Sequence, residues 1–326
     1  MLNRVALRCC CVALAAGLLP AVSGWAQNWP VKPVRFIVPF PPGGSTDVLG
    51  RIVAAKLTDA LGQQVVVDNR SGAGGIIGTD AVVKAPPDGY TLLMTASAPI
   101  AINVTLFKNI PYDPRKDLVP VTRIGSTPLV LVTHPSVPAR SVQELIALLR
   151  ARPHDFTYAS AGNGTPQHLS AELFKTLANV KMNHVPFKGS GPAMIDVISG
   201  QIPITFEVFI TALSYVKGGR LRALAQTGGA RSAHLPQVPT IAETGVPGYE
   251  SAGWYGIFAP AGTAAAVSGR VHAEMARIMA GVDMQQRMAD LGADPASETP
   301  EQFGVFIRAE IVKWAKVIKD SGATAD

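Results

Sequence analysis

The stretch Phe36-Ile-Val-Pro-Phe-Pro-Pro-Gly-Gly-Ser-Thr-Asp47, followed by the helix-prone segment 48–61, decides the fold. It opens with a short apolar run that predicts a buried strand. Two prolines and two glycines end this strand, and the Ser-Thr-Asp sequence after them favours a helix start. A glycine-rich turn between a strand and a helix leaves backbone N–H groups unpaired at one point, which favours an anion. The alternative is an ordinary capped strand–helix turn. We call residues 41–47 the first glycine turn.

A second stretch repeats this pattern of a strand, a glycine-rich turn and a helix start: Phe156-Thr-Tyr-Ala-Ser-Ala-Gly-Asn-Gly-Thr-Pro-Gln-His168. Thr165 before Pro166 is typical of the N-cap and the first position of a helix. We call residues 161–168 the second glycine turn. Two such turns, each at the carboxyl end of a strand, predict two α/β domains whose strand ends face each other across a cleft.

The N-terminus has the pattern of a secretory signal peptide. A basic start with Arg4 and Arg8 precedes an apolar run at 9–22, and Gly24-Trp-Ala26 predicts cleavage after Ala26. The apolar run is shorter than the about 20 residues needed to span a bilayer. All three cysteines lie within it, so the mature chain is expected to have no disulfide, thiolate nucleophile or cysteine metal site.

The overall charge is mildly basic. Removal of residues 1–26 takes away two arginines and no acid, so the net charge falls from +6 to +4. The remaining lysines and arginines are not clustered, and we expect no nucleic-acid partner. Hydrophobic residues make up 48% of the chain, enough for two globular domains.

Strand and helix patterns alternate in the first part of the chain. Strands are expected at 34–40, 64–67 and 90–95, and this alternation predicts a parallel sheet with right-handed crossovers. Ser97, at the carboxyl end of the third strand, is expected near the first glycine turn. The glycines at 72–78 lack the third glycine of a dinucleotide fingerprint, so no nucleotide cofactor is expected.

A second domain is expected to begin with a strand at 129–133, and the segment 254–260 is interpreted as the return crossing. The predicted organisation is a signal peptide at 1–26, domain 1 at 27–126 and 254–326, and domain 2 at 127–253. The last part of domain 1 is expected to be helical, because apolar residues recur at helical spacing there.

Catalytic motifs of common enzymes are missing from the sequence. It contains no Gly-x-Ser-x-Gly, no His-Glu-x-x-His and no P-loop, and its six histidines lack metal-ligand spacing. We therefore predict no enzymatic activity, no metal and no cofactor. The alternative is a secreted hydrolase of a small carboxylate ester or amide that uses Ser45 or Ser160 with His168. A structural surface protein is disfavoured because there are no repeats.

Several blocks of the chain resemble the tripartite tricarboxylate transporter substrate-binding proteins, the Bug-type receptors. The blocks are Pro39-Phe-Pro-Pro-Gly-Gly-Ser-Thr-Asp47, Asn69-Arg-Ser-Gly-Ala-Gly-Gly75, Pro87-Asp-Gly-Tyr-Thr-Leu-Leu93, Gly164-Thr-Pro-Gln-His168, Ala242-Glu-Thr-Gly-Val-Pro-Gly-Tyr-Glu250 and Trp254-Tyr-Gly-Ile-Phe-Ala-Pro-Ala-Gly262. This resemblance implies a two-domain periplasmic binding protein of the type II-like, Venus flytrap class, with two interdomain crossings. It implies a periplasmic monomer that passes a small carboxylate (mono-, di- or aromatic, or an amino acid) to an inner-membrane permease.

The resemblance also implies the ligand contacts. In the family the carboxylate lies between the two glycine turns, held mainly by amides, hydroxyls and waters. Carried over, the predicted ligand-binding residues are Phe40, Pro41, Gly44, Ser45, Thr46, Asp47, Ser97, Ala161, Gly162, Gly164, Thr165, His168, Lys188 and Glu207. Valine at Gly44 or Gly164 is expected to block the site while leaving the protein folded.

Four of these residues have other interpretations. Asp47 would repel a carboxylate, so it is interpreted as a helix N-cap or as the receiver of a ligand amine or a water. His168 near a helix N-terminus is expected to be neutral, donating to a water or ligand. Lys188 could be solvated or assist the anion, and Glu207 is expected to be hydrogen-bonded at the floor of the cleft.

Overall fold

The structure, a computed structural model, describes residues 29–325. The expected signal peptide at 1–26 lies outside this range. Within the described part of the chain, no helix combines the length and the apolar character needed to cross a membrane.

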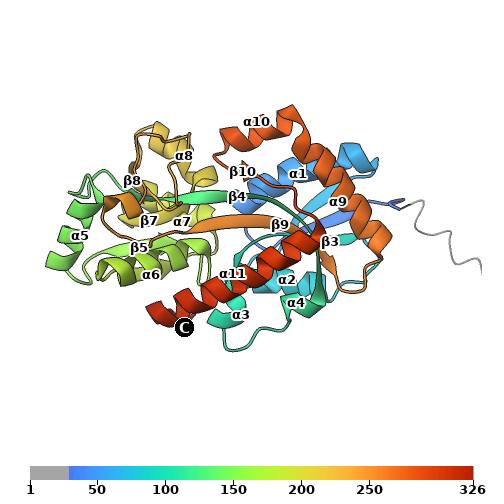
Figure 1. The fold of residues 1–326 in the computed structure, drawn as a ribbon, viewed down its shortest axis with the longest axis horizontal. Helices are drawn as coiled ribbons and strands as arrows, with labels where there is room; N and C mark the ends of the chain where they lie inside the picture. Colours follow the sequence, from blue (N-terminus) through green and yellow to red (C-terminus); the bar gives the residue numbers. More distant parts are fainter. Residues whose placement is uncertain (1–28, 326) are drawn as a thin grey trace, which may run out of the picture.

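The molecule is an elongated α/β protein in which β4 and β9 run along the long axis (Figure 1). The strands are β1 (Val34–Val38), β2 (Val65–Asn69), β3 (Thr91–Ala96), β4 (Leu118–Thr133), β5 (Thr157–Ser160), β6 (Asn183–Pro186), β7 (Ile204–Val208), β8 (Arg222–Gln226), β9 (Ala252–Pro260) and β10 (Asp294–Pro295). The helices are α1 (Ser45–Leu61), α2 (Ile76–Val83), α3 (Asn103–Leu106), α4 (Pro114–Asp117), α5 (Val142–Ala151), α6 (Pro166–Ala178), α7 (Ser190–Ile198), α8 (Phe209–Lys217), α9 (Ala265–Ala280), α10 (Val282–Asp290) and α11 (Pro300–Ser321). Short 3₁₀ turns at Ala73–Gly75 and Ala242–Thr244 and a π-helical turn at Ala98–Ile102 complete the fold.

The strands pair in the order β2-β1-β3-β9-β4-β7-β5-β6, with β8 and β10 also paired to β4. β1 is parallel to β2 and β3, and β5 is parallel to β6 and β7, as strand–helix alternation predicts. β9 is antiparallel to both β3 and β4. The first residues of β4 pair with β9 and its last five pair with β7, so this strand connects the two groups of parallel strands.

β4 is longer than expected, because the sequence predicted a strand only at 129–133. Its earlier part contains Pro120 and Gly125, which disfavour a regular strand in a sequence pattern. The register against β9 shifts between Pro120 and Thr122 and again between Arg123 and Gly125. These irregularities accommodate both residues in a continuous strand.

Helices cover both faces of each group of strands (Figure 1). Beside β1 and β3, α1, α9 and α10 bury residues such as Leu57 and Met275 on one face, while α11 buries Trp314 on the other. In the second group, α5 and α6 bury Phe174 on one face and α7 and α8 bury Phe209 on the other. The carboxyl ends of β1 and β3 therefore face those of β5, β6 and β7 across the middle of the molecule.

Candidate functional site

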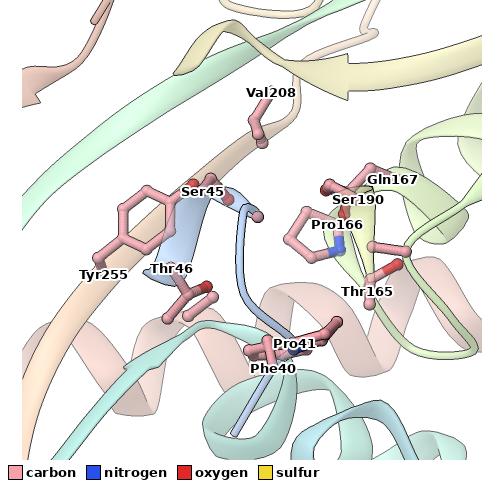
Figure 2. Close-up of a pocket in the computed structure, with 14 residues that line it drawn as sticks. Phe40, Pro41, Ser45, Thr46, Thr165, Pro166, Gln167, Ser190, Val208 and Tyr255 are labelled. Atoms are coloured by element: carbon pink, nitrogen blue, oxygen red, sulfur yellow. The ribbon is translucent and has the colours of Figure 1, made fainter. Parts of the chain in front are cut away.

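A cavity lies where these strand ends meet (Figure 2). One side carries Ser45, Thr46 and Tyr255, and the other carries Thr165, Gln167 and Ser190 (Figure 2). Its lining consists of Phe40, Pro41, Gly44, Ser45, Thr46, Ala96, Ala161, Thr165, Pro166, Gln167, Ser190, Val208, Gly253 and Tyr255. None of these described lining residues is Asp, Glu, His, Lys or Arg.

The first glycine turn presents the start of α1 to the cavity. Gly44 occupies the N-cap position in an extended conformation (φ −80°, ψ 166°), and no side chain caps the helix. Ser45 and Thr46 are its first two helical residues, and their backbone N–H groups have no acceptor within the helix. The positive end of the helix dipole therefore lies against the cavity.

Asp47 is not the N-cap residue, which corrects one interpretation of the sequence. It is the third residue of α1, and its carboxylate accepts a hydrogen bond from the Gly43 amide at 3.0 Å. It also pairs with Arg51 at 3.0 Å and accepts from Asn69 at 2.9 Å. Burial alone would raise the pKa of Asp47, but these hydrogen bonds lower it below the ordinary value. Asp47 thus holds the turn rather than lining the cavity.

Two further helices begin at the opposite wall. α6 starts at Pro166 with Thr165 as N-cap, as predicted, and α7 starts at Ser190 with Gly189 as N-cap. First-turn residues of α1, α6 and α7 all line the cavity. Three helix N-termini therefore converge on a space without a charged side chain, an arrangement that suits an anion held by amide dipoles.

Glu207 lies behind this wall and is fully buried. Its Oε1 accepts from Gln167 Nε2 and Ser190 Oγ, both at 3.0 Å. The same oxygen accepts from the Val208 amide at 2.9 Å and the Thr211 hydroxyl at 2.8 Å. Burial raises the pKa of Glu207 above its ordinary value, and these hydrogen bonds offset part of the rise. Glu207 is thus hydrogen-bonded beneath the cleft, where the sequence suggested it would be.

His168 also lies behind the cavity. Its Nδ1 accepts from the Gly164 amide at 3.2 Å, and its ring stacks on His184 with centroids 4.2 Å apart. Burial lowers the pKa of His168 to about 4 and that of His184 to about 3, with smaller effects from neighbouring charges. The buried Ser160 hydroxyl contacts His184 Nε2 at 2.6 Å and not His168. Among the residues the structure describes, Ser45 has no hydrogen bond to a histidine, so the Ser–His168 pair of the hydrolase hypothesis is not assembled.

The predicted ligand-binding residues fall into three groups. Those that line the cavity are Phe40, Pro41, Gly44, Ser45, Thr46, Ala161 and Thr165. Gly162 and Lys188 line a neighbouring cavity, which shares Phe40, Pro41 and Ala161 with the first. The others are not among the lining residues of either cavity: Asp47, Ser97, Gly164, His168 and Glu207. In residues 29–325, no three His, Cys, Asp or Glu side chains are grouped to hold a metal ion.

Seven lining residues were not predicted: Ala96, Pro166, Gln167, Ser190, Val208, Gly253 and Tyr255. Most are sequence neighbours of predicted residues, and Pro166 and Gln167 stand inside the second glycine turn. Their position next to predicted residues in the sequence indicates that they are near the site. Whether each side chain points into the cavity depends on how its helix or strand is rotated against the cleft.

The two walls touch each other around the cavity. A β-carbon on Gly44 would lie 3.9 Å from Cβ of Ser190, and one on Gly74 would lie 2.6 Å from the carbonyl oxygen of Asn163. One on Gly164 would lie 2.2 Å from Oδ1 of Asn103. The cleft between the strand ends is therefore closed in this structure.

Comparison with known proteins identifies the relatives of this fold. The model of the "Tripartite tricarboxylate transporter family receptor" family matches residues 49–323. Protein BugT of Bordetella pertussis is 43% identical over 309 residues, which is 94% of each chain.

Solved structures agree with this match. The structure of R. palustris Rpa4515 with adipate has a TM-score of 0.89 and 37% identity, covering 91% of this chain and 99% of that one. MatC from Rhodopseudomonas palustris with bound malate has a TM-score of 0.85 and 30% identity, with coverage of 89% and 100%. These likenesses confirm the predicted α/β class of two-domain periplasmic binding proteins. The chain belongs to the tripartite tricarboxylate transporter receptor family, as its motifs predicted.

Proposed function

We propose that this protein binds a small carboxylate in the central cavity and delivers it to a membrane permease of the tripartite tricarboxylate type. The convergence of three helix N-termini on a cavity without charged lining side chains carries this proposal. Such a site supplies donors to an anion without an arginine or lysine. The adipate and malate bound by two relatives support a carboxylate as the class of ligand.

The ligand contacts that we propose come from both glycine turns. Amides and hydroxyls of Ser45 and Thr46 would act with the first-turn amides of α6 and α7. Each side then contributes part of the donor set, so the closed form gains free energy only when the ligand bridges both sides. Hinge closure would occur between the parts predicted as 27–126 with 254–326 and as 127–253.

The proposal also covers the location of the protein, its oligomeric state and its lack of catalysis. Cleavage after Ala26 would release it into the periplasm, where the family of receptors works. A monomer is sufficient, because one chain supplies both walls of the cavity. We propose a receptor and not an enzyme, which means that the ligand leaves the cavity chemically unchanged.

A thermal-shift screen of the mature protein against small carboxylates tests the proposal. Acids that raise the melting temperature are then titrated by calorimetry, and the bound material is recovered and identified by mass spectrometry. Saturable binding with the acid recovered intact supports a receptor. Turnover of an ester or amide that is lost in the Ser45→Ala variant would instead support the hydrolase. A panel without any stabilising carboxylate would contradict the proposal.

A further inference from the structure

Helix α11 reaches from one side of the cleft to the other (Figure 1). In its first turn, Phe303 packs against Phe258, a residue of β9 that pairs with β3. Its last turns lie beside α6 of the opposite group, where Ile318 shares a buried cluster with Leu169. The helix is therefore held on one wall and contacts the other.

The residues after α11 continue onto the second glycine turn. Gly322 ends the helix in a left-handed conformation (φ 67°). Ala323 and Ala325 are half-buried and pack against the same cluster. The side-chain amide of Asn163 donates to the carbonyl oxygen of Ala325 at 2.5 Å. We call residues 322–325 the C-terminal segment.

Asn163 lies at the centre of the second glycine turn. Its neighbours Gly162 and Gly164 have φ values of +127° and +76°, so the backbone folds sharply on both sides of it. The carbonyl oxygen of Asn163 lies against Gly74 of the opposite wall, and its side chain bonds to the C-terminal segment. Because this turn leads directly into α6, whose first residues line the cavity, contacts to Asn163 help to hold that wall in place.

The bond to the C-terminal segment differs from the contacts near the strand crossing. There, the Thr127 hydroxyl donates to the carbonyl oxygen of Gly292 at 3.1 Å, and Thr127 pairs with Gly253 where β4 and β9 run together. Atoms at a hinge move little when two parts of a protein rotate apart. Asn163 instead lines the neighbouring cavity between the two walls. Separation of the walls would therefore break its bond to Ala325.

We propose that the C-terminal segment is a latch, which bonds to the second glycine turn in the closed cleft and stabilises the closed form over the open one. This inference rests on the proposed receptor function and its hinge closure. It assigns a role in closure to Ala323 and Ala325, which line neither cavity. One hydrogen bond of this kind shifts such an equilibrium about two- to tenfold, and the packing of the two alanines adds to it.

A disulfide tests whether the latch contact forms in solution. All three cysteines of the sequence lie at 9–11, so the chain after the expected cleavage site has none to interfere. Asn163→Cys is combined with Ala325→Cys. The control combines Ala325→Cys with Lys181→Cys, an exposed residue beyond the far end of α6, which is about 20 Å long. Under mild oxidation the first pair should close at least about tenfold faster than the control pair.

Spin labels test whether the latch favours the closed cleft. Ala55→Cys and Ile195→Cys place the labels at exposed positions on α1 and α7, helices that begin on opposite walls. Pulsed electron resonance then gives the distances between them, without ligand and with adipate. The parent protein is compared with a chain that stops after Ser321 and with Asn163→Ala. Both changes should lower the ratio of closed to open molecules by about two- to tenfold or more.

Asn183→Ala is the matched control. The side-chain amide of Asn183 donates to the carbonyl oxygen of His154 at 2.6 Å, so this change removes the same type of bond within one side of the cleft. Its distance distribution should equal that of the parent. Circular dichroism and melting temperature check folding, and Asn163→Ala keeps the test valid even if the shortened chain does not fold.

Three outcomes would overturn the latch. The first is equal oxidation rates for the two cysteine pairs. The second is a distance distribution that neither the shortened chain nor Asn163→Ala alters, with or without adipate. The third is an equal shift in Asn183→Ala, which would indicate a general loss of packing. A shift confined to the two latch variants, combined with failure of every acid in the thermal-shift screen to bind, would support the latch and overturn the proposed function.

Discussion

Gly189 lies against the ring of Pro41 so closely that a β-carbon on Gly189 would fall 2.4 Å from Cγ of Pro41. Pro41 belongs to the first glycine turn, and Gly189 is the N-cap of α7 on the opposite wall. The absence of a side chain at Gly189 thus allows the two walls to meet over the cavity.

Gly189→Ala is expected to weaken ligand binding at least about tenfold, because the added methyl group keeps the walls apart. Gly189 also has a φ of +128°, so alanine there introduces backbone strain of about 1–3 kcal/mol. Gly245→Ala is the matched control, since Gly245 has a φ of +89° and an added methyl group there would meet nothing within 4 Å. Both variants should lose stability in urea, but only Gly189→Ala should lose affinity by calorimetry. Equal affinities in the two variants would refute a role for this contact in closure.

Gly44→Val is expected to abolish binding while the protein remains folded. Gly44 has a φ of −80°, which any residue adopts, and its β-carbon would make ordinary contacts at 3.7–3.9 Å. The branched methyl groups of valine would then occupy space between α1 and Ser190. Gly44→Ala is the control and should lose at most about tenfold in affinity. An unchanged affinity in Gly44→Val would exclude this part of the cavity as the site.

Gly164→Val does not provide the same test, contrary to the expectation from the sequence. Gly164 has a φ of +76°, and a β-carbon would lie 2.2 Å from Oδ1 of Asn103. The variant should therefore lose about 1–3 kcal/mol or more of stability from strain alone. A melting temperature equal to that of the parent protein would contradict this assignment.

Asp47→Asn is expected to lower the free energy of unfolding by about 1–3 kcal/mol. Asparagine retains one accepting oxygen, but it lacks the negative charge that pairs with Arg51 and the second oxygen of the carboxylate. The hydrogen bonds from the Gly43 amide and from Arg51 cannot then both be kept at full strength. Urea denaturation at neutral pH measures the change. Asp320→Asn, which alters an exposed pair with Lys316, is the control and should have little effect. A loss no larger than that of the control would show that Asp47 does not hold the first glycine turn.

The stacked pair His168 and His184 should make stability depend on pH. Both pKa values are lowered from 6.5, to about 4 and about 3. Between pH 6.5 and about 4 the unfolded chain therefore binds more protons than the native protein, and stability decreases as the pH falls. Each histidine contributes a slope of up to about 1.4 kcal/mol per pH unit.

Urea denaturation of the parent protein and of His184→Gln across this pH range measures the slope. The variant should show a shallower decline, while His154→Asn, which changes an exposed histidine, should match the parent. Identical slopes in all three proteins would show that His184 is protonated equally in the native and unfolded states.

The sequence predicted the parts of the site that local chemistry determines. Proline, glycine and hydroxyl residues define the starts of α1 and α6, and Thr165 and Pro166 take the expected positions. Gln167 and His168 are adjacent in the chain but point differently: Gln167 lines the cavity, whereas His168 stacks on His184. Neighbouring residues on a helix project about 100° apart, and only the packing of α6 decides which one faces the cleft.

Contacts between distant parts of the chain explain why the sequence did not predict other lining residues. Tyr255 and Gly253 reach the cavity because β9 lies between β3 and β4, an arrangement that no local pattern encodes. The Ser190 hydroxyl donates to Glu207, which follows it by 17 positions in the sequence. A sequence pattern identifies both residues as polar but does not show that one is bonded to the other.

A crystal structure of the mature protein with the acid that most raises its melting temperature tests the assignment of the site directly. We expect the carboxylate within hydrogen-bond distance of the amides of Ser45 or Thr46 on one wall and of the first turn of α6 or α7 on the other. A carboxylate bound to one wall only, or held by Lys188 in the neighbouring cavity, would contradict it.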